Sequence, residues 1–302
     1  MKTIRSLSAV TKWSRALRRE GVTIALVPTM GALHAGHRAL IRAARLCCDA
    51  VVVSIFVNPT QFGPKEDFAR YPRPLRKDQA LCKAEGVDMI FAPDTASMYP
   101  DRFQTVVSVP GIARCWEGAA RPTHFQGVAT IVTKLLCLVG PDAAFFGQKD
   151  YQQATLVRRL VTDLNIGCAI IVHPTVREFD GLALSSRNVY LSQAERQAAP
   201  VLYRGLSAGA QALGKGARVS KDIIRVMAGL IAQERLARVE YLAVCNPVTL
   251  EPVTTVRGDC VLLGAIRVGS IRLIDNMPVG VSKKPPRSRG DARRRTLRDQ
   301  KV

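Results

Sequence analysis

The chain has 302 residues, of which 47% are hydrophobic, and a formal net charge of +20. This length and apolar content predict a folded protein with room for two domains, and they exclude a chain that is disordered throughout. No apolar run reaches the roughly 18 residues that a membrane-spanning helix needs. The basic amino terminus lacks the apolar core of a signal peptide, and its Trp13 and Leu17 predict a surface helix. Eight scattered cysteines without a C-x-x-C pair favour a cytoplasmic protein.

The positive charge is concentrated at the carboxyl terminus. Residues 281–302 contain nine Lys or Arg and two Asp, a net charge of +7, which leaves +13 of the +20 for the rest of the chain. The segment has almost no apolar residues, so we expect a disordered tail. We interpret it as a solvated tail, with contact to nucleic acid or an acidic surface as the alternative. The remaining charge suits anionic substrates.

The first chemical motif follows the first predicted strand. Residues 22–27 are apolar and β-branched, and Pro28 has no N–H to donate, so we expect the strand to end there. A helix with an apolar and a basic face is predicted over 37–48. The turn between them contains Gly31 and Gly36. It lies at the carboxyl end of a strand and at a helix amino terminus, where phosphate groups bind.

His34 and His37 are three residues apart, so on one helical turn their imidazoles face the same phosphate position. We interpret the pair as groups that stabilise charge on a nucleotide's phosphates. The two neighbouring glycines let backbone and ligand approach closely. Two alternatives remain open. The histidines could only cap the helix, or they could ligate a metal, although the chain has just four histidines and no third ligand nearby.

A second polar loop follows the next predicted strand, at 49–57, and contains Asn58 and Gln61. The ends of two parallel strands then face one crevice, in which uncharged amides suit the hydroxyl and carboxylate groups of a small ligand. A simple Asn-Pro turn is the alternative. Further predicted elements are a helix over 78–84, strands at 87–92 and in the run 104–110, and a buried helix over 128–140.

A second strand, glycine turn and helix start is predicted at residues 141–153. Lys149 can place a compact positive charge on phosphates, and Asp150 can accept from ribose hydroxyls or cap the following helix. Helix and strand are predicted to continue to about residue 176. Beyond them the tripeptide Ser185–Arg187 has two hydroxyls and a guanidinium, which are groups that can hold triphosphate oxygens, but in isolation this pattern indicates no site.

The composition changes from about residue 190, where Ala- and Arg-rich helical segments are followed by strand-like runs at 239–245 and 260–277. This order of elements predicts a smaller α+β domain. We therefore divide the chain into three parts. They are an α/β catalytic domain with a parallel, Rossmann-like sheet (1–188), an α+β carboxyl-terminal domain (189–280) and the basic tail (281–302).

Four motifs together resemble the pantothenate synthetase (pantoate–beta-alanine ligase) family of the nucleotidyltransferase superfamily. They are PTMGALHAGH at 28–37, FVNPTQF at 56–62, GQKD with QQ at 147–153, and LSSRN at 184–188. The resemblance covers residues 1 to about 280. Other small-acid nucleotidyltransferases of the H-x-G-H type are the alternative, but the two glutamine motifs disfavour them. The basic composition suggests a nucleic-acid-binding protein as a rival, although no basic stripe interleaved with aromatics exists outside the tail.

The resemblance implies a fold and an activity. The fold is a Rossmann-like nucleotidyltransferase domain with the carboxyl-terminal domain as a lid, in a cytoplasmic homodimer with neither membrane nor nucleic acid as partner. The activity is ATP-dependent condensation of (R)-pantoate with β-alanine through a pantoyl-adenylate intermediate. Magnesium accompanies ATP, and no residue is implied as a dedicated metal ligand.

The resemblance also implies roles for individual residues. The catalytic residues would be His34, Lys149, Arg187 and His37, the last as proton donor. Gln61 and Gln153 would bind pantoate, and Gln61 also β-alanine. The ATP-binding residues would be Met30, Gly31, Ala32, Leu33, His34, Ala35, Gly36, His37, Gly147, Gln148, Lys149, Asp150, Val176, Leu184, Ser185, Ser186 and Arg187.

The chain departs from the usual family pattern at four positions. Thr123 and Gln126 stand where relatives usually have Gly and Arg, Gln148 where many have Glu, and Leu184 where Met is usual. Leucine keeps the volume of methionine, so packing should tolerate that change. The side chain of Gln148 is not expected to point at ATP. We expect His124, between the first two positions, to be structural.

Removal of the tail after Gly280 is expected to leave turnover nearly unchanged, because every motif lies upstream of it. The measurement is kcat and KM of a chain ending at Gly280 beside those of the full chain, at equal ionic strength. A DNA-binding assay at rising salt on both chains tests the basic-protein rival. A large drop in turnover would show that the tail reaches the site.

Overall fold

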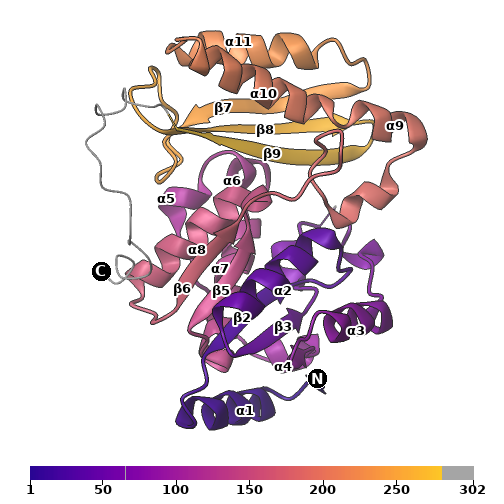
Figure 1. The fold of residues 1–302 in the computed structure, drawn as a ribbon, viewed down its shortest axis with the longest axis vertical. Helices are drawn as coiled ribbons and strands as arrows, with labels where there is room; N and C mark the ends of the chain where they lie inside the picture. The colour runs from indigo at the N-terminus through magenta and orange to yellow at the C-terminus, as the bar shows by residue number, and fades with distance from the viewer. Residues whose placement is uncertain (65, 281–302) are drawn as a thin grey trace, which may run out of the picture.

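The structure, a computed structural model, describes residues 1–64 and 66–280, so the predicted tail at 281–302 lies outside the described residues. Two sheets organise the described chain (Figure 1). The first has six parallel strands in the order β1-β4-β3-β2-β5-β6, which confirms the predicted parallel α/β fold. Its strands are β1 (Lys2–Ile4), β2 (Ile24–Thr29), β3 (Ala50–Ile55), β4 (Met89–Phe91), β5 (Ala143–Gly147) and β6 (Ala169–His173).

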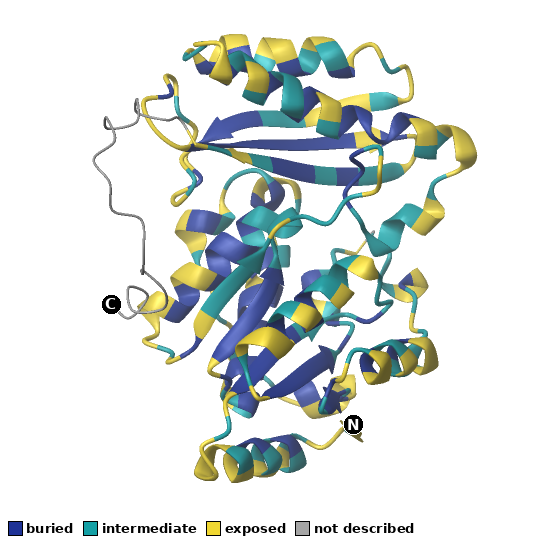
Figure 2. Ribbon diagram, in the orientation of Figure 1, coloured by how far each residue is buried: buried dark blue, intermediate teal, exposed yellow. Residues whose placement is uncertain are grey.

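Helices cover both faces of this sheet because successive strand side chains point to opposite faces. On β2, Ile24 and Leu26 share a core with α1, α7 and α8, whereas Ala25 and Val27 share one with α2 and α3. Figure 2 shows the central strands β2, β3 and β5 as the most buried part of this layer. The helices are α1 (Leu7–Arg19), α2 (Ala35–Cys47), α3 (Leu75–Ala84), α4 (Thr95–Met98), α5 (Pro110–Ala113), α6 (Glu117–Ala120), α7 (His124–Val139) and α8 (Tyr151–Asp163).

The second sheet is antiparallel, in the order β7-β8-β9, and confirms the predicted α+β composition of the carboxyl-terminal part. On β8, Leu262 and Ile266 pack with α10 and α11, whereas Val261 and Leu263 join the core that contains α7 and α8. The domain boundary at residue 188 stays a prediction. The elements are α9 (Gln193–Ala198), α10 (Val201–Gly214), α11 (Ser220–Ile231), β7 (Ala237–Cys245), β8 (Cys260–Val268) and β9 (Ile271–Val279).

The strand order creates a switch point beside β2. From β2 the chain continues to β3 and β4 on one side, and it later returns to β5 and β6 on the other. Open α/β sheets bind ligands outside the carboxyl ends of strands at such a point. Four short 3₁₀ turns lie near it: η1 (Pro59–Gln61), η2 (Phe68–Arg70), η3 (Gln148–Asp150) and η4 (Ser186–Tyr190).

Several predicted boundaries were wrong. The strand β2 continues through Pro28 because its pairing with β5 ends at Leu26, and a strand with one remaining neighbour tolerates a missing N–H. The run 104–110 forms no strand, and the Val107 N–H instead donates to Thr130 Oγ1 on α7. The helix predicted over 78–84 begins earlier, as α3, and the short β1 was not predicted.

Two observations bear on the expectations drawn from composition. Across residues 1–64 and 66–280, no helix combines the length and the apolarity that crossing a membrane requires. All eight cysteine side chains are free thiols, so no disulfide contributes to the fold.

Candidate active site

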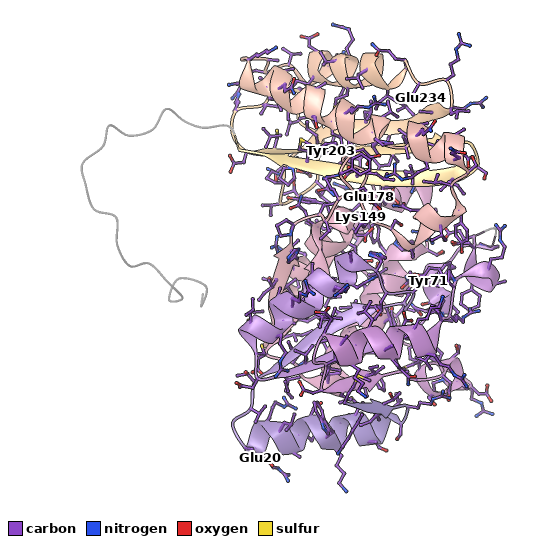
Figure 3. All side chains as sticks on the ribbon, turned by 45° about the vertical axis from the view of Figure 1, so that its right-hand side comes forward. Glu20, Tyr71, Lys149, Glu178, Tyr203 and Glu234 are labelled. Carbon is purple, nitrogen blue, oxygen red and sulfur yellow. The ribbon has the colours of Figure 1, made fainter. Side chains whose placement is uncertain are left out.

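A cleft of about 1090 Å³ lies at the switch point, between the first sheet and the second. In Figure 3 the labelled Lys149 lies directly beneath the second sheet. The predicted site residues Gly31, Ala32, Leu33, Ala35 and Gln148 do not line this cleft. Those that do are Met30, His34, Gly36, His37, Gln61, Gly147, Lys149, Asp150, Gln153, Val176, Leu184, Ser185, Ser186 and Arg187.

Backbone N–H groups in the turn after β2 donate hydrogen bonds to a buried carboxylate. The N–H groups of Ala32 and Leu33 donate to Asp78 on α3 at 3.0 and 2.8 Å, and Asp78 is only 2% exposed. Gly31 has φ +83, and a Cβ there would lie 3.0 Å from Asp78 Oδ2. These residues shape the turn from behind. Their predicted role in binding ATP therefore stays a prediction.

The two histidines form the start of α2. The His34 N–H donates to His37 Nδ1 at 3.2 Å, and the Gly36 N–H donates to His34 Nδ1 at 3.1 Å. The rings lie side by side, with centroids 4.1 Å apart. A Cβ at Gly36 would lie 2.9 Å from His34 Cε1, so this approach requires glycine. Because each Nδ1 accepts a hydrogen bond, each neutral ring carries its proton on Nε2 and can donate it to a ligand.

Both imidazoles are neutral at pH 7. Burial and the nearby Lys149 lower the pKa of His34 to about 4, against the opposite effect of Asp150. Burial and the adjacent His34 lower the pKa of His37 to about 3. At neutral pH the proton-donor role implied for His37 is therefore hydrogen-bond donation from Nε2–H. The capping interpretation and the ligand-binding interpretation are compatible, since they use different ring nitrogens.

These two histidines are expected to make the fold less stable as the pH falls from 6.5. An unfolded histidine binds its proton near pH 6.5, but His34 and His37 do so in the fold only near 4 and 3, so within this window the unfolded state binds more protons. Each group contributes at most ~1.4 kcal/mol per pH unit. His37→Asn removes one titrating ring and keeps an acceptor for the His34 N–H. Its urea midpoint should fall less steeply than that of the parent chain between pH 6.5 and 4, and equal slopes would refute the assignment.

The turn η3 carries a charged pair into the cleft. Lys149 Nζ lies 3.4 Å from Asp150 Oδ1, and the two side chains are 21% and 47% exposed. Burial alone would raise the pKa of Asp150, but Lys149 lowers it below its ordinary value, so the carboxylate is ionised at neutral pH. Asp150 stands at the N-cap of α8 without a side-chain capping bond. Of its two predicted roles, acceptance from a ligand is the one its geometry favours.

Gln61 and Gln153, predicted for pantoate, line the same cleft from η1 and α8. Gln61 Nε2 lies 2.9 Å from Met30 Sδ, and Gln61 Oε1 accepts a hydrogen bond from Asn58 Nδ2 at 3.2 Å. Gln152, the other glutamine of the QQ pair, is buried and donates to two backbone carbonyls in and beside α5. Both glutamines of the QQ pair line the cleft, but the Gln152 amide is bonded to backbone groups of the protein, which indicates a structural role.

Arg187 on η4 is bound to a carboxylate that covers the site. Its Nε and Nη2 donate to Asp67 at 3.0 and 2.9 Å. The guanidinium carbon lies 5.9 Å from the centroid of the Tyr71 ring, whose hydroxyl is 3.3 Å from Ser186 Oγ. Burial would raise the pKa of Asp67, but Arg187 lowers it overall. The predicted triphosphate role of Arg187 therefore requires phosphate to share this guanidinium with Asp67.

His124 lies behind the loop that carries Gln61. Its Nδ1 is 2.9 Å from the Gln61 carbonyl oxygen, and burial together with Arg121 lowers its pKa to about 4. The contact holds the backbone of a site residue, which supports the structural role expected for His124. Thr123 has φ −92, a value that needs no glycine, so this departure from the family pattern leaves the backbone unstrained.

Sequence reasoning missed Asp67, Asp78 and Asn276. Asp78 was predicted only as part of a helix, and Asp67 lies outside the four motifs. Asn276 belongs to β9 and donates to the carbonyls of η3. Their partners are 45 to 128 positions away in the chain. No local pattern could have found these three residues.

Sequence comparison agrees with this geometry. A family model described as pantoate-beta-alanine ligase matches residues 2–278. A pantothenate synthetase from Heliobacterium modesticaldum is 49% identical over 281 residues, which are 93% of this chain and 100% of the relative. One from Chloroflexus aurantiacus is 52% identical over 254 residues, or 84% and 90% of the two chains. The range matched by the family model includes all the motifs that line the cleft.

Crystal structures of similar proteins share the fold. A pantothenate synthetase from Thermus thermophilus is 47% identical with a TM-score of 0.87, over 92% of this chain and 99% of the other. A pantoate-beta-alanine ligase from Francisella tularensis, described as a complex with beta-gamma ATP and β-alanine, is 33% identical with a TM-score of 0.77, over 93% and 100%. This chain therefore belongs to the pantoate–beta-alanine ligase family and is an enzyme of that family.

Proposed function

We propose that the cleft joins (R)-pantoate to β-alanine in two steps. The pantoate carboxylate attacks the α-phosphate of ATP, which forms pantoyl adenylate and releases pyrophosphate. The deprotonated amine of β-alanine then attacks the acyl carbon, and AMP leaves. The observation that carries this proposal is the convergence of two imidazole donors, Lys149, the Ser185–Arg187 tripeptide and two glutamines on one cleft. The Francisella relative, described with beta-gamma ATP and β-alanine, supports the same substrates.

Charge stabilisation is the main work of the first step. Both Nε2–H groups of His34 and His37 can donate to phosphate oxygens from a helix start whose caps already fix the rings. Lys149 adds a positive charge that is only 21% exposed, so water screens it weakly. Donors that are fixed before the reaction cost no reorganisation when charge develops on the departing pyrophosphate. Ser185, Ser186 and Arg187 extend this set of donors.

The two glutamines supply positioning rather than charge. Gln61 and Gln153 offer amide groups that can hold pantoate beside the α-phosphate, and Gln61 is the residue we assign to β-alanine as well. Holding two reactants in line converts a bimolecular step into an effectively unimolecular one. The contacts of Asn58 and Met30 to the Gln61 amide fix its orientation in advance.

Magnesium fits this site as a companion of ATP. Mg²⁺ is usually held by one or two carboxylates together with substrate phosphates and water, so it needs no cage of protein ligands. Asp150 offers an ionised carboxylate that lines the cleft and is 47% exposed, which is the hard oxygen donor that such an ion requires. Bound there with ATP, the ion would neutralise negative charge on the phosphates.

We also propose that the enzyme works as a homodimer in the cytoplasm, as the family resemblance implies. Eight free thiols suit a reducing compartment. Sedimentation of the full chain across a concentration series measures the oligomeric state. A monomer at every concentration would overturn this part of the proposal.

Pyrophosphate is expected to exchange into ATP when pantoate is present without β-alanine. Pantoate held by the two glutamines can attack the α-phosphate before any amine is bound, so adenylation needs no second acceptor. The measurement is incorporation of labelled pyrophosphate into ATP by the purified chain, with and without pantoate. An exchange that strictly required β-alanine would indicate a concerted reaction and contradict the adenylate.

The pH dependence separates the two steps. The amine of β-alanine is protonated at neutral pH and must lose that proton before it attacks. Acidification should therefore slow formation of pantothenate more than it slows the exchange. Both rates are measured on the same preparation from pH 8 down to 6.5, above the range in which the buried histidines destabilise the fold.

A further inference from the structure

We infer that Asn276, on the second sheet, is a positioning residue that sets Lys149 for the departure of pyrophosphate. The inference rests on the proposed role of Lys149. Asn276 is 2% exposed and lies on β9, whereas Lys149 lies on η3, after β5 of the first sheet. The contact thus joins two sheets whose residues meet only in the tertiary structure.

Residues of η3 form hydrogen bonds with all the polar groups of the Asn276 side chain. Its Nδ2 donates to the carbonyl oxygens of Gln148 and Lys149 at 2.8 and 2.9 Å. Its Oδ1 accepts from Gln148 Nε2 at 3.2 Å. A primary amide has two N–H groups and one carbonyl oxygen, so every polar group of this side chain is engaged by two consecutive residues. The side chain therefore fixes the peptide planes on both sides of the Lys149 Cα atom.

The backbone of Asn276 is itself fixed by a buried ion pair between Asp275 and Arg177. Its N–H lies 2.8 Å from Asp275 Oδ1, which accepts this bond. Arg177 donates to both oxygens of Asp275 at 2.6 and 2.9 Å, and its guanidinium carbon lies 4.4 Å from the centroid of the Tyr203 ring. Asp275 is 6% exposed, so water competes little with this bidentate pair. Asn276 consequently meets η3 in one orientation.

Lys149 needs such support because its own contacts are few. A lysine has a flexible four-carbon stem, and the only bond of the ammonium group within the described residues is the 3.4 Å contact to Asp150. The direction in which the stem leaves the backbone therefore decides where the charge lies. Misplacement of a reacting or stabilising group by about 1 Å can cost roughly 10²-fold in rate. Docking of the second sheet on η3 thus completes the Lys149 site.

Four proteins test this inference: the parent chain, Asn276→Ala, Lys149→Met and the double variant. The first readout is the kcat of pantoate-dependent pyrophosphate exchange. The second is pantothenate formation from supplied pantoyl adenylate and β-alanine. We expect Asn276→Ala to slow the exchange by about 10- to 100-fold and the second step by less than about twofold. In the Lys149→Met background, removal of Asn276 should cost less than about twofold, because the residue it positions is already gone.

Matched variants separate positioning from stability. Asn246 directly follows β7 of the same sheet, and its side chain accepts from the Val248 and Thr249 N–H groups rather than contacting η3. Asn246→Ala therefore removes a structural asparagine, and any loss of rate should be equal in the exchange and in pantothenate formation. Asn276→Leu nearly keeps the size of the side chain but removes both donors without adding a charge, and it should resemble Asn276→Ala. If Asn276→Ala does not fold, Asn276→Ser takes its place in the comparison, because serine retains a single hydrogen-bond donor.

The outcomes are distinguishable. An equal loss in both steps, or an undiminished loss in the Lys149→Met background, would overturn the positioning role of Asn276. An unchanged exchange rate in Lys149→Met alone would instead overturn the role proposed for Lys149. Thermal unfolding of each variant, recorded beside the rates, shows that the folded protein was compared throughout.

Discussion

His37→Asn is expected to lower the kcat of pantoate-dependent pyrophosphate exchange by about 10²- to 10³-fold, the usual cost of removing one preorganised donor to a developing charge. Asparagine can place its Oδ1 near the position of the imidazole Nδ1, so it can still accept from the His34 N–H. It cannot reach the position of Nε2. The variant therefore removes the donor to phosphate while it retains the helix cap, and stability should change little at pH 7.

His37→Gln is the complementary variant. Its amide nitrogen can occupy the position of Nε2, but nothing replaces the Nδ1 acceptor of the cap. Loss of a helix cap costs about 1 kcal/mol, so this variant should unfold more readily than His37→Asn and retain more of the exchange rate. The two variants are compared by exchange kinetics and by urea unfolding. Unchanged turnover in His37→Asn would remove His37 from the catalytic residues.

Lys149→Met is expected to slow adenylate formation by about 10²- to 10³-fold, because it deletes a weakly screened positive charge where pyrophosphate departs. Methionine keeps most of the stem volume, so packing around η3 should survive. The attack of β-alanine on supplied pantoyl adenylate should be much less affected, since pyrophosphate has already left by then. A loss confined to that second step would contradict the assignment.

Lys134→Met is the matched control. Lys134 lies on α7 and does not line the cleft. Its ammonium group is 4.6 Å from the Phe103 ring centroid and 5.7 Å from the Tyr99 ring centroid. The same loss of charge there should leave the exchange rate within about twofold. Arg187→Ala should also slow adenylation, but it leaves Asp67 unpaired with a side chain only 18% exposed, so its loss includes a structural cost.

The sequence by itself determined the parallel sheet and the motifs that line the cleft. The motifs sit where strands end, and the order of strands and helices requires those ends to meet at one edge of a parallel sheet. The histidine turn, the Gln61 loop and η3 were therefore predicted to meet, and the family resemblance added the Ser185–Arg187 tripeptide. The structure places all four around one cleft. Local periodicity likewise predicted the buried helix α7, because its apolar run is long and uninterrupted.

Only the tertiary structure decided how these groups are held and charged. Whether the turn after β2 offers its amides to ligand depends on Asp78, 46 positions from Ala32, and the freedom of Arg187 depends on Asp67, 120 positions away. The neutral state of both histidines follows from burial and from nearby charges, which no local spacing encodes. A motif specifies which chemical groups arrive at a site. Their protonation and orientation depend on distant residues that meet there only when both sheets have packed.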